Sequence, residues 1–142
     1  MKTQLLLLLV ASSVVGCSGA VRSPEDYRDD TGKLFETKAG AMKACYDDVL
    51  KATPGASGTV TAQFRWSKDD GALQDIAIDP NASTAPAPVQ ECVVKSLAGL
   101  TMTPIDAKNG VGSWTFEFHA PPPPASPPPT APTDPVPERA PG

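Results

Sequence analysis

Two kinds of hydrophobic periodicity alternate along the chain between residues 33 and 120. Apolar residues recur every three or four positions from Lys33 to Leu50, up to a breaker at Pro54-Gly55, which predicts an amphipathic helix. After a loop of Pro, Ala and Ser at residues 79–88, the same spacing returns over residues 88–98. The chain is therefore expected to contain two amphipathic helices.

Three further segments alternate between apolar and polar residues, which is the pattern of a strand with one buried face. The first covers residues 58–66 and the second residues 73–78, and the turn between them ends in Gly71. A third strand is expected over about residues 111–118. The aromatic residues of the strands occupy one face only, so Trp66 and Trp114 are interpreted as core residues and not as exposed binding groups.

This order, α-β-β-α-β, predicts an α+β fold with a three-stranded antiparallel sheet. Because each strand is apolar on one face only, two helices packed on one face would cover the sheet. The second helix returns the chain, so the third strand is expected to run antiparallel beside the first, in the sheet order second-first-third. The third strand is then an edge whose main-chain groups have no partner.

The beginning of the chain has the features of an export signal. Lys2 precedes an apolar run, and Val14-Val15-Gly16-Cys17 has the pattern of a bacterial lipobox. We therefore expect residues 1–16 to be a lipoprotein signal peptide and Cys17 to hold the mature protein at a membrane through its lipid. The alternative is an ordinary signal with an incidental cysteine. Ser18 in place of an aspartate favours the outer membrane, facing the periplasm, but this sorting rule varies between bacteria and leaves the inner membrane open.

Two segments contain little that a core could bury. Residues 17–32 mix charge, Gly and Pro without periodicity and are interpreted as a lipidated flexible tether. Residues 121–142 are rich in proline and are expected to form a disordered, extended tail of at most about 68 Å, at about 3.1 Å per residue. Residues 33–120 remain as one small domain.

Charge and cysteine content narrow the possible partners and the compartment. Loss of Lys2 with the signal changes the net charge from −4 to −5, which disfavours nucleic acid because phosphate binding needs a basic face. Lipidation of Cys17 leaves Cys45 and Cys92, both on the apolar stripes of their helices. An exported compartment favours a disulfide between them. Two separate buried thiols are the alternative.

No residue pattern indicates catalysis, a metal site or a cofactor. His119 is the only histidine, and it stands at a strand end beside the proline run, where nothing orients it as a base. The pairs Asp29-Asp30, Asp47-Asp48 and Asp69-Asp70 lack the alternating spacing of a calcium loop and are interpreted as solvated faces and turns. The sequence therefore favours a non-enzymatic protein.

Five motifs in order resemble the TonB-like C-terminal domain of the AgmX/PglI type over residues 37–120. They are Cys45-Tyr46, Pro54-Gly55, a Gly-x-Val-x-x-x-Phe strand from Gly58 to Phe64, Asp70-Gly71, and Val-x-x-Cys-Val at residues 89–93. The family usually ends its second helix with Trp-x-Phe-Pro, whereas this chain has Leu-Thr-Met-Thr at residues 100–103. TonB proper also has a membrane helix and a proline-rich spacer before the domain, whereas here a lipid would replace the helix and the proline-rich segment follows the domain. The resemblance therefore does not imply energy transduction.

The resemblance implies a protein-binding module, because TonB domains receive partner peptides beside their sheet. We therefore expect a cell-envelope adaptor that binds an envelope protein or peptide of unknown identity along its third strand. The residues of that edge are Ser113, Trp114, Thr115, Phe116, Glu117 and Phe118. The charge of Glu117 and the prolines from Pro121 fit this role only in part and could instead prevent strand pairing. The alternative function is a structural spacer that links membrane and peptidoglycan through the tail.

Overall fold

Three antiparallel strands form a sheet in the order β2-β1-β3. The computed structural model describes residues 21–126. Within them, β1 is Gly58–Trp66, β2 is Leu73–Ile78 and β3 is Gly110–Phe118. The α+β fold, the antiparallel pairing and the central position of β1 are confirmed.

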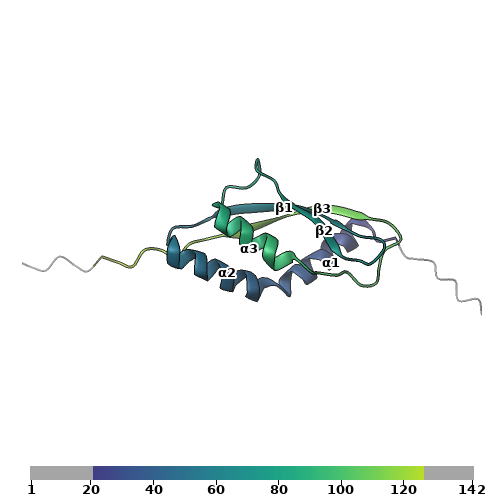
Figure 1. Cartoon of the computed structure of the whole chain (residues 1–142), viewed down its shortest axis with the longest axis horizontal. Coiled ribbons are helices and arrows are strands. Elements are labelled where there is room, and N and C mark those ends of the chain that lie inside the picture. The colour runs from purple at the N-terminus through teal and green to yellow at the C-terminus, as the bar shows by residue number, and fades with distance from the viewer. Residues whose placement is uncertain (1–20, 127–142) are drawn as a thin grey trace, which may run out of the picture.

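The alternation along β1 decides which face of the sheet is covered. Val60, Ala62, Phe64 and Trp66 are all buried, whereas Gln63 between them is exposed. The turn to β2 depends on Gly71, which has a φ of 70° that residues with a side chain rarely adopt. Burial of one face only is the reason that the helices gather on that side (Figure 1).

Two helices, α2 (Ala39–Ala52) and α3 (Ala87–Leu97), pack against each other beneath the sheet. Both turn an apolar stripe inward, on which Met42, Tyr46, Val89 and Val93 are buried. The Tyr46 hydroxyl donates a hydrogen bond of 2.6 Å to the carbonyl of Ala56, so this buried polar group is satisfied. None of the helices in the described part of the chain is both long and apolar enough to cross a membrane.

A further helix, α1 (Pro24–Glu36), corrects the sequence analysis. Residues 24–32, which we expected to belong to a flexible tether, form most of it. Its start is determined locally: the side chain of Ser23 accepts the N–H of Asp26, the Asp26 carboxylate accepts the N–H of Ser23, and Pro24 occupies the first turn. These caps stabilise a helix even though only Thr31 and Phe35 of its residues are buried.

The single helix predicted from Lys33 is therefore two helices. α1 ends at Glu36 and is capped by Thr37, whose hydroxyl donates to the carbonyl of Leu34 at 2.6 Å, and α2 begins at Ala39. Three helices, not two, cover the inner face of the sheet (Figure 1). The end of α1 belongs to the core, because Phe35 is only 4% exposed.

The two ends of the described chain leave the domain on opposite sides along its long axis (Figure 1). After β3, residues 119–126 form neither helix nor strand. Pro121 to Pro124 line one shallow hollow together with Leu50, Pro54 and Gly55 beyond the end of α2. The rest of the proline-rich segment, residues 127–142, lies outside the described residues.

Candidate functional site: the free edge of β3 and the cleft beside α1

The edge strand β3 is the candidate binding site. It pairs with β1 over its whole length, from Gly110 opposite Trp66 to Phe118 opposite Gly58. Within residues 21–126 it has no strand on its other side. The side chains of Thr115 and Glu117 are exposed on the outer face, whereas Phe118 is buried.

The hydrogen bonds of β1 show which of its main-chain groups face β3. The carbonyl of Thr61 accepts the N–H of Asp79 at 2.9 Å, and the carbonyl of Thr59 accepts the N–H of Ala85 at 3.0 Å. Both bonds lie on the side of β1 that faces away from β3. Because the main-chain groups of successive strand residues point to alternate sides, the even-numbered residues of β1 bond to β3.

The same alternation shows which main-chain N–H and C=O groups of β3 are unpaired. Val60 lies opposite Phe116 and Ala62 lies opposite Trp114, so the even-numbered residues of β3 direct their N–H and C=O groups to β1. The odd-numbered residues direct theirs to the free edge. These residues are Val111, Ser113, Thr115 and Glu117.

A cleft of about 520 Å³ runs along the first half of β3, between this strand and α1. α1 contributes one wall and the strands contribute the other wall and the floor. The lining residues of α1 are Pro24, Tyr27, Arg28 and Thr31, and those of the strands are Phe64, Trp66, Val111, Gly112, Ser113, Trp114 and Thr115. No pattern in the sequence predicted this cleft.

Two glycines on the inner face of β3 shape the cleft. A Cβ atom on Gly110 would lie 2.5 Å from the ring of Tyr27, and one on Gly112 would lie 3.3 Å from the ring of Phe64. Any side chain at Gly110 would therefore collide with Tyr27, which packs directly on the strand. The inner face of the strand is left without side chains at these two positions, and aromatic rings come close to it.

The floor of the cleft is a cluster of aromatic rings. Phe35 packs edge-on against Phe64 and Trp114, with ring centres 5.4 and 5.5 Å away, and Phe64 packs edge-on against Trp66. The indole N–H of Trp66 donates to the hydroxyl of Thr31 at 3.1 Å. The indole N–H of this floor is thus already satisfied, and it does not need a ligand as a partner.

An ionic cluster holds the start of α1 against the loop that precedes β3. The N–H of Arg22 donates to the carboxylate of Asp106 at 2.7 Å, and the guanidinium of Arg22 donates to Asp30 at 2.9 Å. The N–H of Lys108 donates to Asp106 at 3.0 Å, and the hydroxyl of Tyr27 donates to the carbonyl of Lys108 at 3.2 Å. These bonds set the width of the cleft, because they fix α1 relative to β3.

The pKa values in this cluster follow from the same contacts. The N–H of Arg22 stabilises the charged carboxylate and holds the pKa of Asp106 below its ordinary value, although burial acts in the opposite direction. The bond from the Arg22 side chain likewise lowers the pKa of Asp30. Burial raises the pKa of the Tyr27 hydroxyl, and the neighbouring Asp106 raises it further. Charged forms of both carboxylates therefore stabilise the attachment of α1.

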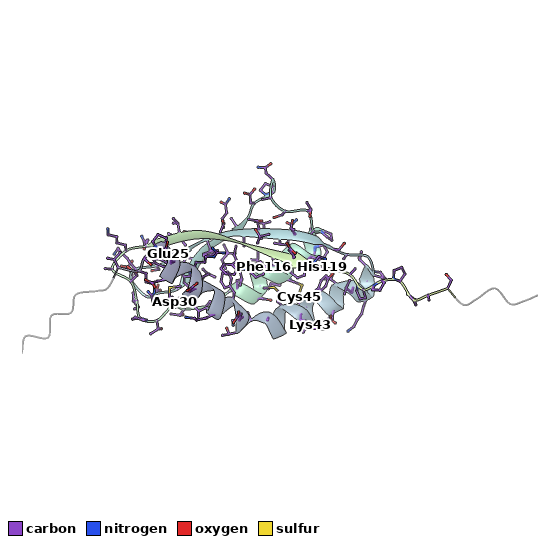
Figure 2. All side chains as sticks on the ribbon, turned by 180° about the vertical axis from the view of Figure 1, so that it is seen from behind. Glu25, Asp30, Lys43, Cys45, Phe116 and His119 are labelled. Atoms are coloured by element: carbon purple, nitrogen blue, oxygen red, sulfur yellow. A yellow bond between two sulfur atoms is a disulfide. The ribbon has the colours of Figure 1, made fainter. Side chains whose placement is uncertain are left out.

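The predicted disulfide is confirmed. Cys45 of α2 and Cys92 of α3 are bonded, with their Cα atoms 5.6 Å apart (Figure 2). Cys92 is 1% exposed. The disulfide lies beneath the sheet and away from the cleft, so it stabilises the fold and takes no part in the candidate site.

Other residues considered in the sequence analysis lie apart from the cleft. His119 is exposed beyond β3, with Nε2 3.6 Å from the Glu117 carboxylate (Figure 2). Asp47 and Asp48 form ion pairs with lysines of the same helix, and Asp70 accepts the N–H of Ala72 in the turn. The described residues contain no group of three or more potential metal ligands. Cys17 lies outside the described residues.

One sequence signal could have indicated the helical wall of the cleft. Ser23-Pro24-Glu25-Asp26 combines an N-cap residue, a proline at the first helical position and acids in the first turn, which is a helix start signature. No signal in the sequence pairs Tyr27 with Gly110, because these residues are far apart along the chain and meet only in the folded protein.

Comparisons with known proteins do not assign the chain to a family. No protein-family model, no curated protein and no solved structure matches it. The similarity to TonB-like domains therefore rests on the sequence motifs described above and stays a prediction.

Proposed function

We propose that this protein is a cell-envelope lipoprotein that acts as a non-catalytic protein-binding or adaptor module. Cys17 would hold it at the membrane, and the free edge of β3, residues 113–118, would receive an extended peptide of an envelope protein. The observation that carries the proposal is this free edge, whose outward-pointing main-chain groups lie beside an aromatic cleft. Such an edge can accept a peptide as an additional strand.

Two features support a binding role over catalysis. The sequence motifs resemble a family whose domains receive peptides beside their sheet. His119 has Glu117 as its ion-pair partner, and within the described residues no serine or cysteine side chain is hydrogen-bonded to it. A histidine without a nucleophilic side chain in hydrogen-bond reach is not arranged to activate one as a general base.

The edge limits how a peptide could be added. Val111, Ser113 and Thr115 are exposed and uncharged, so they present no electrostatic barrier to a neighbouring strand. Glu117 carries a charge, and the prolines from Pro121 cannot donate main-chain hydrogen bonds. These features favour a short added strand, confined to β3 itself, over continuous sheet growth.

Replacement of Thr115 by proline tests the edge directly. The N–H of Thr115 points to the free edge, so Thr115→Pro would remove a donor available to a partner and leave the bonds to β1 in place. We expect in-cell crosslinking followed by mass spectrometry to recover the partner at least about tenfold less with this variant than with wild type, the size of a loss of about 1.4 kcal/mol.

Thr115→Val is the matched control. It keeps the N–H and removes only the hydroxyl, which lies 2.8 Å from the hydroxyl of Thr61. Both variants are first compared by circular dichroism and thermal melting. A folded Thr115→Pro variant that captures the same partners as Thr115→Val in equal amount would contradict the proposal.

A specific observation also favours the alternative function, a structural spacer. Because the described chain enters and leaves the domain at opposite ends, residues 121–126 lie at the end opposite to the one at which the chain enters (Figure 1). Deletion of residues 121–142 separates the two functions. The adaptor proposal expects partner capture at the β3 edge to persist, whereas the spacer proposal expects the protein's association with peptidoglycan to be lost in a sedimentation assay.

A further inference from the structure

We infer that the cleft between α1 and β3 is a side-chain pocket that selects peptides with an aromatic residue and an acidic residue two positions later. This inference rests on the proposed function, because it assigns a specificity to a peptide added at the β3 edge.

Strand geometry places alternate side chains of an added peptide over the cleft. The peptide would bond to the odd-numbered residues of β3, whose side chains lie on the outer face. Residues directly opposite in neighbouring strands share a face of the sheet. A peptide residue opposite Gly112 would therefore direct its side chain toward the helices, into the cleft lined by Tyr27, Thr31 and Phe64.

Gly112 is the position at which such a side chain has space. The next inward-facing positions of β3 are Trp114 and Phe116, whose rings already pack against Phe35. At Gly112 no side chain competes, and the nearest ring is that of Phe64. The volume of about 520 Å³ is sufficient for one large side chain together with part of the peptide backbone.

The lining favours an aromatic side chain. Phe64 and Trp66 form an apolar floor, and Tyr27 and Trp114 are half-buried at its sides. Aromatic pairs in edge-on or offset contact contribute about 0.5–1.5 kcal/mol beyond the burial of their area. An alanine in the same place would make few contacts with the half-buried rings of Tyr27 and Trp114.

The rim of the cleft carries a positive charge. Arg28 is the charged residue among those that line it, and it forms no ion pair with any of residues 21–126. Its neighbour Arg22, by contrast, is engaged by Asp30 and Asp106. A guanidinium that is unpaired within residues 21–126 and lies beside an aromatic pocket favours a carboxylate two positions from the aromatic residue, because side chains two positions apart in a strand share a face.

The two tryptophans of the chain, Trp66 and Trp114, both line the cleft, so tryptophan emission reports its occupancy. The probe, called the Phe-Glu peptide, is a nine-residue host peptide of Thr, Val and Ser with Phe-Thr-Glu at its centre, and it contains no tryptophan. Peptides with Ala-Thr-Glu and Phe-Thr-Lys at the centre, called the Ala-Glu and Phe-Lys peptides, are its controls. Each is titrated into the full mature lipoprotein in detergent micelles, with fluorescence anisotropy of labelled peptide as a second readout.

We expect the Phe-Glu peptide to bind at least tenfold more tightly than the Ala-Glu peptide and to shift the tryptophan emission to the blue. Gly112→Ala narrows the pocket and should abolish this difference. Gly40→Ala is the control, because a Cβ atom there meets nothing within 4 Å. Arg28→Glu, at an exposed position, should reverse the preference between the Phe-Glu and Phe-Lys peptides without a change in the melting temperature.

The outcomes distinguish this inference from the proposed function. Equal binding of the Phe-Glu and Ala-Glu peptides, with both weakened by Thr115→Pro, would overturn the pocket and keep the edge. Binding that is weakened by Gly112→Ala but unchanged by Thr115→Pro would keep the pocket and overturn strand addition. If no peptide of the set binds at millimolar concentration, both are overturned.

Discussion

At the scale of single residues, Asp106 decides how α1 is attached. Its side chain is 4% exposed and accepts the main-chain N–H groups of Arg22 and Lys108. A buried carboxylate is stable only when its oxygens are paired, and here the partners come from two segments that are distant in sequence. Asp106 thus connects the entry of the chain to the loop before β3.

We predict that Asp106→Asn destabilises the domain by about 1–3 kcal/mol at pH 7, because charged hydrogen bonds are replaced by weaker neutral ones. Urea unfolding followed by tryptophan emission measures the change. Asp29→Asn, at an exposed position of α1, should differ from wild type by less than about 0.5 kcal/mol. A loss of the same size in both variants would contradict the role assigned to Asp106.

The lowered pKa of Asp106 also predicts how the stability of the domain depends on pH. Its pKa is lowered by folding, so its stabilisation is complete above the unfolded value of about 3.9 and is lost as the pH falls through the lower, folded value. Wild type should therefore lose stability below about pH 4, and Asp106→Asn should lose less over that window. Some acid sensitivity should remain in the variant, because the pKa of Asp30 is lowered as well.

At the scale of elements, the domain is held together by two different means. The disulfide joins α2 to α3, and both contact the sheet through buried apolar stripes. α1 has no covalent link of this kind, and it is attached through Phe35, the Trp66–Thr31 hydrogen bond and the cluster around Arg22. The cleft is therefore bounded by the most weakly attached helix on one side and by the sheet on the other.

We predict that the double variant Cys45→Ala and Cys92→Ala unfolds with a free energy lower by about 2–4 kcal/mol. Closing a loop with a sequence separation of 47 residues removes conformational entropy from the unfolded chain, by about 4 kcal/mol in the chain-entropy model. Urea unfolding of the variant and of oxidised wild type measures the difference. Equal midpoints of the two proteins would show that the disulfide does not support the fold.

At the scale of the whole molecule, the described chain enters the domain at one end and leaves it at the other. The chain enters next to α1 and the cleft, and it leaves beyond α2 at the opposite end (Figure 1). If Cys17 carries the lipid, the cleft lies at the end of the domain from which the chain leads to the anchor, and residues 121–126 lie at the other end. A partner peptide would then dock at the end of the domain that leads to the anchor.

We predict that Cys17→Ser abolishes membrane attachment, because a hydroxyl cannot accept the diacylglycerol thioether. Detergent phase partitioning should recover wild type in the detergent phase and the variant in the aqueous phase or as uncleaved precursor. Ser18→Ala, which keeps the cysteine, is the control and should partition like wild type. A Cys17→Ser variant that remains in the detergent phase after cleavage would refute lipidation at this residue.

Local patterns were sufficient to predict the sheet. The alternation in β1 and β3 and the turn at Gly71 indicated the strands and the β1–β2 hairpin from residues near one another in the chain. The pairing of β3 with β1 followed from the order of the elements, because a helix returns the chain before β3. The placement of Cys45 and Cys92 on apolar helical stripes was likewise sufficient for the disulfide. The start of α1 was also encoded locally, at Ser23, but few apolar residues follow it, and the periodicity that predicts the other helices is absent.

The cleft could not be predicted in this way, because its walls meet only after folding. Arg22 bonds to Asp106 across 84 residues, and Tyr27 lies over Gly110. Neither contact is marked in the sequence by a hydrophobic period or a motif. The glycines of β3 alone do not indicate which aromatic ring lies against them. Docking of a polar helix depends on a few specific long-range bonds and on the space left by absent side chains. These exist only when α1 and β3 are packed together.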